Sequence, residues 1–193
     1  MSNRFIHAQV EEWRETGFVI IPDFFTEAEI APIREDFATL YSDRGQGDGV
    51  GAERNFKKEG EIGASHPKQF MNFDQMPYGA SPAINLISLH PQLIEFSKAL
   101  LGVREVHCYQ SHTWLKYTGE ADYDQAFHCD FGNHTLTVPS EQVAQRTVDF
   151  VIYLCDVEDD LGALHYVTKQ DVADVLGPGE LIAPPDKQLE LKS

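Results

Sequence analysis

His128 and Asp130, two residues apart in the stretch AFHCDFGNHTL, are the side chains of this sequence best suited to bind a metal ion together. The surrounding aromatic and β-branched residues favour a β-strand. Because residues i and i+2 of a strand project to the same side, both side chains would face one site. An imidazole and a carboxylate on one face are suitable ligands for a transition metal such as iron.

The spacing alone is weak support for a metal site. A chain with 8 histidines and 15 aspartates among 193 residues contains about 0.6 His-x-Asp pairs by chance. Non-haem Fe(II) oxygenases hold their iron with two histidines and one carboxylate, and leave the remaining positions open for a co-substrate and O2. An iron site therefore requires a third ligand and a co-substrate pocket elsewhere in the chain.

The segment 110–117 offers such a pocket lining. If it forms a strand, its polar and aromatic residues share one face at a period of two, namely Gln110, His112, Trp114 and Lys116. A polar face inside a small barrel is costly unless it contacts water or a ligand, so this pattern favours a pocket. Two simpler interpretations stay open: Trp114 as an ordinary core residue, and Lys116 as a side chain that extends its charge into solvent.

The first forty residues predict two helices and a strand. Apolar residues at helical spacing from Phe5, followed by Gly17, predict a short helix that ends in a left-handed cap. The apolar run FVII at residues 18–21 predicts a buried strand. Thr26 and Glu29 have the spacing of a capping box, which predicts that a second helix begins there.

Pro91 and Gly102 are placed to begin and end a further helix, and after Gly102 the pattern changes to strands. The strand-like stretches are separated by turn residues and read VREVHCY, QSHTWLKY, AFHCDF, TVDFVIYLCDV and ALHYVT. Helices followed by strands are typical of an α+β domain. We therefore expect one domain over residues 1–193, helical to about residue 102, with a β core from about residue 103 and the helices packed on one side of it.

The charge balance excludes several partners. The net charge is −16 and the pI is about 4.7, so nucleic acid and an anionic membrane surface would repel the chain. The N-terminus lacks the apolar segment of a signal peptide, and the longest strongly apolar run is too short to cross a bilayer. Three cysteines in no metal-finger spacing suit a reducing compartment. We expect a cytoplasmic protein whose partner is a small molecule, with the oligomeric state left open.

Two other stretches resemble a phosphate-binding loop and a calcium-binding loop in composition, but their residues do not have the spacing that such loops require. The glycine-rich GQGDGVG, in the polar segment 42–66, lacks the Lys-Ser/Thr pair of a phosphate-binding loop and contains Asp48, so a mobile loop is expected there. The acidic cluster around Asp159 lacks the alternating positions, central glycine and distal glutamate of a calcium loop. A solvated turn is the expected structure of that cluster.

The order of these pieces resembles the phytanoyl-CoA dioxygenase family of Fe(II)- and 2-oxoglutarate-dependent oxygenases. The similarity covers nearly the whole chain in five stretches: VEEWRETGFVIIPDFFTEAEI, LHPQLIEFSKALLG, QSHTWLKY, FHCDFGNHTL and VIYLCDVEDDLGALHYV. The resemblance implies a double-stranded β-helix, also called a jelly-roll or cupin-like barrel. It also implies an enzyme that uses Fe(II) and O2 to convert 2-oxoglutarate to succinate and CO2 while it hydroxylates a small organic substrate.

The same resemblance assigns roles to six residues: iron ligands for His128 and Asp130, 2-oxoglutarate contacts or pocket lining for Gln110, Trp114 and Lys116, and a substrate-pocket position for His134. The carboxylate of Asp130 argues against the halogenase branch of the family, in which a small residue at this position leaves room for chloride. The substrate itself is not specified by these positions, because loops rather than the scaffold determine it.

The sequence departs from the family pattern after GAL, where the family has a Pro-Gly-Ser-His turn and this chain reads LHYVTKQDVADV. The family's distal iron histidine and the arginine that binds 2-oxoglutarate lie several strands further on, past Ser193. His165 stands too early in the barrel to be the third ligand. The final KQLELK alternates as a strand does. We therefore expect an incomplete barrel whose C-terminal strands belong to a longer parent chain.

Two function classes stay open on the sequence alone. The first is a 2-oxoglutarate-dependent dioxygenase. The second is a catalytically inactive barrel that binds a small molecule but lacks the complete iron triad. Anaerobic addition of Fe(II) and 2-oxoglutarate distinguishes these two classes, because a charge-transfer absorbance between iron and the keto acid supports the enzyme and its absence in the complete chain supports the binding barrel.

Overall fold

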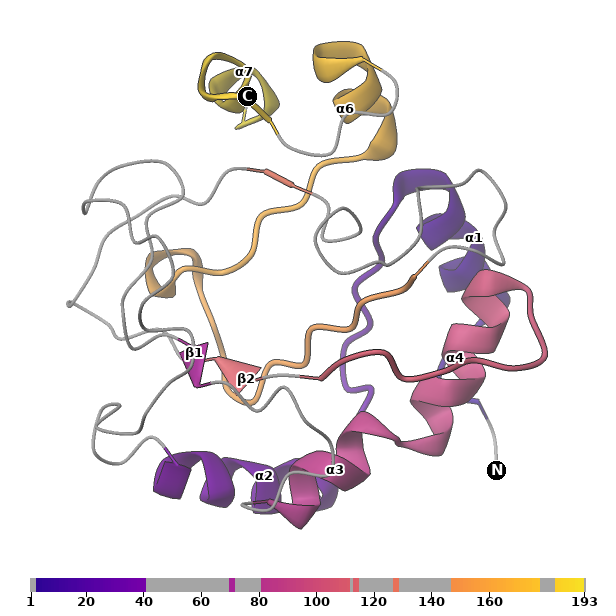
Figure 1. Cartoon of the computed structure of the whole chain (residues 1–193), viewed down its shortest axis with the longest axis vertical. Coiled ribbons are helices and arrows are strands. Elements are labelled where there is room, and N and C mark those ends of the chain that lie inside the picture. The colour runs from indigo at the N-terminus through magenta and orange to yellow at the C-terminus, as the bar shows by residue number, and fades with distance from the viewer. Residues whose placement is uncertain are drawn as a thin grey trace.

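A computed structural model describes residues 3–40, 70–71, 81–111, 113–114, 127–128, 147–177 and 183–192. Its helices are α1 (His7–Thr16), α2 (Glu27–Leu40), α3 (Pro82–Ser88), α4 (Pro91–Leu101), the 3-10 turn η2 (Asp159–Leu161), α6 (Lys169–Leu176) and α7 (Pro185–Lys192). The strands are β1 (Phe70–Met71) and β2 (Thr113–Trp114). The helices lie around the outside, and extended segments of the chain cross the middle (Figure 1).

The helix ends follow the local chemistry predicted for them. Gly17 ends α1 in the left-handed region, with φ 98°, and its N–H donates to the carbonyl of Trp13. Glu29 Oε2 accepts hydrogen bonds from the backbone N–H and the hydroxyl of Thr26, which forms the predicted start of α2. Pro91 opens α4 and Gly102 closes it, also in the left-handed region. The three helix predictions are therefore confirmed.

Two neighbouring hydrophobic clusters form the core beneath the extended segments. One joins α1 to α4 through Val10, Phe96 and Leu100, and the other joins α2 to α3 through Ile30, Ile33, Ile84 and Ile87. The segment 147–157 crosses both clusters. Val148 and Phe150 pack on the first, and Ile152 and Leu154 pack on the second. Alternate residues of this segment therefore face the helices, as in a strand with one covered side.

The described residues contain one short antiparallel ladder, between β1 and β2, and an isolated bridge at His128. Phe70 lies opposite Trp114, and Met71 lies opposite Thr113. Among the described residues, the predicted strands at 18–21, 103–109, 147–157 and 163–168 have no strand assignment. Residues 115–126 and 129–146, which contain much of the expected β core, lie outside the described residues. The double-stranded β-helix therefore stays a prediction.

The prediction of a strand at 187–192 is wrong. These residues belong to the helix α7, which Pro185 begins and in which Lys187 pairs with Glu190 one turn on. Pro185 suits the first turn of a helix, because its missing N–H has no intrahelical partner there. Leu191 is buried, and α7 packs against α6. Helix packing therefore overrides the alternating pattern of KQLELK.

Lys169, at the start of α6, connects that helix to α1. Its ammonium group donates to the carbonyl of Arg14 at 3.1 Å and lies 5.3 Å from the ring centre of Trp13. Its stem lies on Gly17, where an added Cβ would come within 2.9 Å of Lys169 Cγ. Arg14 in turn donates to the carbonyl of Ala99 in α4. The helix α1 is therefore connected to α6 through Lys169 and to α4 through Arg14.

A charged network connects the N-terminal segment to the beginnings of α2 and α4. Arg4 donates two hydrogen bonds to the carboxylate of Glu29, at 2.8 and 2.9 Å. His90 Nδ1 accepts from the backbone N–H of Gln92, so its Nε2 is the donor to Glu29 Oε1 at 3.1 Å. The hydrogen bonds from Arg4 hold the pKa of Glu29 well below its ordinary value of 4.5. Glu29 is therefore ionised in the folded protein throughout the neutral range.

Replacing Glu29 by glutamine is expected to lower the free energy of unfolding at pH 7 by about 1–2 kcal/mol, because charge-assisted hydrogen bonds to a partly exposed carboxylate are lost. A carboxyl group with a depressed folded pKa stabilises the fold above its ordinary pKa, and this contribution is lost as the pH falls below that value. The difference between Glu29→Gln and the wild type should therefore shrink in acid unfolding curves between pH 5 and about 3. Glu27→Gln is the matched control, because Glu27 lies in the same first turn of α2 as Glu29 and is an exposed carboxylate that pairs with Arg34.

Candidate functional site

His128 is the one member of the predicted iron pair that the structure describes. It forms a β-bridge, and its side chain is exposed. The preceding residue, Phe127, accepts a hydrogen bond at 2.8 Å from the backbone N–H of Ala183, which lies immediately before α7. The C-terminal segment therefore helps to hold the backbone at His128, although this segment was expected to be a strand of its own.

The remaining predicted site residues are described in part or not at all. Asp130, Lys116 and His134 lie outside the described residues, as does the segment 42–66. The backbone of Trp114 lies in β2, opposite Phe70. Within the described ranges, no group of three His, Cys, Asp or Glu side chains is arranged to hold a metal ion. Because Asp130 falls in a gap between these ranges, the predicted iron pair is not tested by this result.

The described part of segment 110–117 contacts α3 through Ser111. Thr113 is buried. The Ser88 hydroxyl donates to the carbonyl of Ile84, so Ser111 is the donor in the 2.9 Å contact between the two serine hydroxyls. Gln110, at the opposite parity, is exposed. Exposed and less exposed residues therefore alternate at 110–113, but the predicted pocket face of Gln110, His112, Trp114 and Lys116 stays a prediction, because the side chains of the last three lie outside the described residues.

The helix α3 that anchors this strand was missed in the sequence. Its N-cap Ser81 is fully buried, accepts from the N–H of Ile84, and donates to the carboxylate of Asp36 in α2. Ser81 followed by Pro82 is a recognisable start of a helix, and this signal could have identified α3. Ser88 at the end of α3 is therefore a supporting residue that sequence reasoning did not find.

His165 is paired within its own loop. Its Nε2 lies 2.7 Å from Asp159 Oδ1, and both side chains are exposed. Asp159 begins the turn η2, which Gly162 closes in the left-handed region. This local pair agrees with the expectation that the acidic cluster forms a solvated turn, and it gives His165 a partner other than a metal ion.

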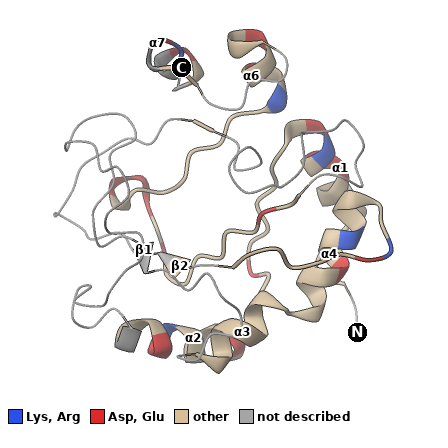
Figure 2. Cartoon of the chain, viewed as in Figure 1, with Lys and Arg blue, Asp and Glu red and all other residues tan. Residues whose placement is uncertain are grey.

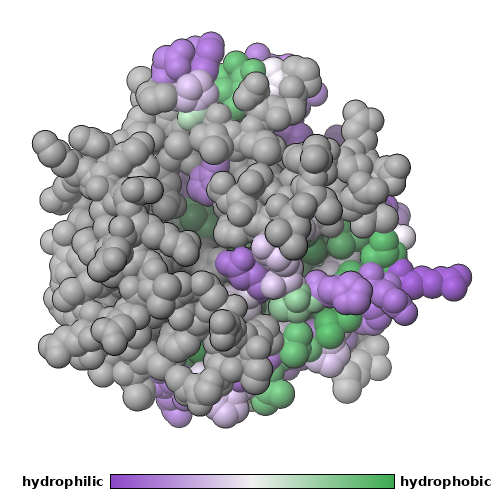
Figure 3. Space-filling view, in the orientation of Figure 1, coloured by the Kyte–Doolittle hydropathy of each residue, from purple (hydrophilic) through white to green (hydrophobic). Residues whose placement is uncertain are grey.

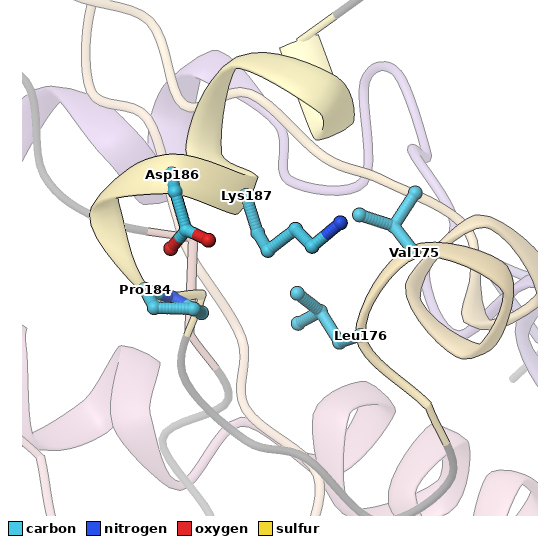
Figure 4. Close-up of a pocket in the computed structure, with 5 residues that line it drawn as sticks. All are labelled: Val175, Leu176, Pro184, Asp186 and Lys187. Atoms are coloured by element: carbon cyan, nitrogen blue, oxygen red, sulfur yellow. The ribbon is translucent and has the colours of Figure 1, made fainter.

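An open groove of about 330 Å³ lies between α6 and α7 (Figure 4). Five residues line it: Val175, Leu176, Pro184, Asp186 and Lys187. The amine of Lys187 is held by Glu190 at 2.9 Å. Pro184 follows Ala183, so the groove is continuous with the backbone that pairs with Phe127. Its lining contains no histidine or cysteine, and this argues against a transition-metal site in it.

Acidic residues are distributed over the outer helices and the η2 turn (Figure 2). Together with a net charge of −16, this distribution argues against a polyanionic partner. Among the helices of the described residues, none has both the length and the apolar character needed to cross a membrane.

Comparison with known proteins decides the family. The sequence model of phytanoyl-CoA dioxygenase matches residues 13–170, from α1 to the first turn of α6. The chain belongs to the phytanoyl-CoA dioxygenase family. The match includes every residue predicted to bind iron, 2-oxoglutarate or substrate. No curated protein and no solved structure matches the chain.

Proposed function

We propose that this member of the phytanoyl-CoA dioxygenase family is an Fe(II)- and 2-oxoglutarate-dependent dioxygenase that hydroxylates a small organic substrate. The observation that carries the proposal is the family match over residues 13–170, which includes the His128–Asp130 pair. In the overall reaction one atom of O2 enters the hydroxylated substrate and the other enters succinate, while CO2 leaves 2-oxoglutarate.

His128 and Asp130 would hold the metal. Imidazole and carboxylate are the donor types of non-haem iron sites, and residues two apart on a strand face the same side. His128 is exposed and forms a β-bridge, which is consistent with the strand position that the proposal requires. When bound, Fe(II) would activate O2, the oxidant, and 2-oxoglutarate would supply two of the four electrons that reduce it.

Gln110, Trp114 and Lys116 would orient 2-oxoglutarate, and His134 would line the substrate pocket. Gln110 is exposed and alternates with Ser111, which contacts Ser88 of α3, and with the buried Thr113, and this alternation supports a ligand-facing side at Gln110. Lys116 offers a cation for a carboxylate of the co-substrate. Holding the co-substrate in one orientation lowers the entropic cost of the reaction.

The test is succinate release by the native protein in air with Fe(II) and 2-oxoglutarate, measured without an added substrate. We expect slow, iron-dependent formation of equal amounts of succinate and CO2. The second candidate, an inactive binding barrel, predicts binding of 2-oxoglutarate with no succinate. A protein that neither binds 2-oxoglutarate nor forms succinate would overturn the proposal.

A further inference from the structure

The segment before α7 makes a direct backbone contact with the segment that carries His128. The N–H of Ala183 donates to the carbonyl of Phe127 at 2.8 Å. Ala183 is 2% exposed, although the next residue, Pro184, is exposed. Water does not readily replace a hydrogen bond from a buried N–H. This contact therefore constrains the backbone one residue before the predicted iron ligand.

The backbone at Ala183 is held in turn by the helix pair α6 and α7. The N–H of Lys187 donates to the carbonyl of Pro184 at 3.0 Å, at the first turn of α7. Leu191, near the end of α7, is 7% exposed, and α7 packs against α6. In the space-filling view, hydrophobic atoms lie among hydrophilic ones where these two helices lie side by side (Figure 3). Packing of the pair therefore fixes the position of the Ala183 donor.

The helix pair is attached to the rest of the molecule at the start of α6. Thr168 and Asp171 form a capping box there, and Lys169 donates to the carbonyl of Arg14 in α1. The helix α1 belongs to the core through Val10. A continuous set of contacts therefore runs from the core, through α6 and α7, to the backbone before His128.

His128 depends on such support, because its imidazole moves with the backbone that carries it. Among the described residues, His128 forms an isolated bridge rather than a longer ladder. Short strand pairs are marginally stable unless they pack against other elements. Groups that orient a metal ligand change the metal affinity when they are removed, although they do not touch the metal. The Ala183 N–H is therefore placed to affect metal binding through the backbone at His128.

We propose that Ala183 is a positioning residue for the metal site, and that the α6–α7 pair holds the His128 backbone where metal binding requires it. The backbone N–H of Ala183, not its methyl group, has this role. Ala183 and α7 lie outside residues 13–170, which the family model matches, so this support is a feature of this chain. The inference rests on the proposed dioxygenase function and adds the structural unit that positions its iron ligand.

The first test separates the N–H of Ala183 from its side chain. Fe(II) is titrated anaerobically into the native protein against a chromogenic chelator, for the wild type, Ala183→Pro and Ala183→Gly. Proline cannot donate, whereas glycine keeps the N–H. Ala183→Pro should bind Fe(II) about five- to tenfold more weakly, and Ala183→Gly should stay within about twofold of the wild type. A general loss of stability would give the opposite order, because glycine raises the entropy of the unfolded chain and proline lowers it.

The second test loosens the helix pair and keeps the donor. Leu191→Ala leaves a cavity at a buried position of α7, so the Ala183 amide should exchange its hydrogen faster and Fe(II) should bind more weakly. Leu86→Ala, the same change at an exposed position of α3, should alter neither property. The titration also gives the number of Fe(II) sites. A misfolded fraction lowers that number, whereas a displaced His128 lowers the affinity.

Equal Fe(II) affinities in Ala183→Pro and Ala183→Gly would overturn this inference. Unchanged Fe(II) affinity or unchanged exchange of the Ala183 amide in Leu191→Ala would also overturn it, and Leu191→Ala decides the test if Ala183→Pro does not fold. A wild type that binds no Fe(II), or whose affinity is the same in His128→Ala, would overturn the dioxygenase site and this inference with it. Binding that depends on His128 but not on Ala183 or Leu191 would overturn the positioning role alone.

Discussion

Replacing His128 by alanine is expected to lower iron-dependent succinate release by more than about a hundredfold, because loss of a metal ligand costs more than loss of the residues that support it. Asp130→Ala should have the same effect, since both side chains belong to one metal site. The affinity for Fe(II) should fall in parallel with turnover. Succinate formation at several Fe(II) concentrations distinguishes weakened metal binding from a slower reaction.

The matched control for this experiment is His107→Ala, an exposed histidine on the segment after α4. It removes the same side-chain type without touching the predicted iron pair, and its turnover should equal that of the wild type. Retained turnover in His128→Ala or Asp130→Ala would show that the ligand assignment is wrong.

Replacing Phe96 by alanine is expected to lower the free energy of unfolding by about 3–5 kcal/mol, the usual cost of a large cavity in a packed core. Phe96 is 3% exposed and lies in the cluster that joins α1, α4 and segment 147–157. Its ring packs with Phe5 at 4.6 Å, Phe150 at 5.9 Å and Phe24 at 6.1 Å between ring centres. The melting temperature should fall by about 10 °C or more.

Leu86→Ala on α3 is the control for this loss. Leu86 is 74% exposed, so its truncation should change stability by less than about 0.5 kcal/mol. Thermal unfolding of the two variants therefore compares a buried ring with an exposed aliphatic side chain. A fall in melting temperature for Phe96→Ala no larger than that for Leu86→Ala would contradict the packing of this core.

Local chemistry explains which helix ends could be predicted from the sequence. A left-handed glycine at Gly17 and a capping box from Thr26 to Glu29 involve residues within one turn, and the sequence therefore contains the whole signal. Ser81 carries a local signal of the same kind for α3, because Pro82 follows it, but its hydrogen bond to Asp36, 45 residues away, could not be predicted from the sequence. The helix α7 likewise depends on packing against α6, which overrides the alternation of its own residues.

Some features of the candidate site could likewise be predicted from the sequence, and others could not. The spacing of His128 and Asp130 predicts that both residues lie on one side of a strand, and their proposed role as iron ligands comes from the resemblance to the family. The face that carries Val151 and Tyr153 could not be identified from sequence alone, because every residue from 150 to 154 is apolar or aromatic. Packing of Phe150, Ile152 and Leu154 on the helices shows which side of the segment faces the core.

The most direct test of the central claim is anaerobic addition of Fe(II) and 2-oxoglutarate to the native protein, followed by visible absorption spectroscopy. Chelation of iron by the keto acid at the predicted site should produce a charge-transfer band, and this band should be absent in Asp130→Ala. A wild-type spectrum without the band would contradict a 2-oxoglutarate-dependent iron site at His128 and Asp130.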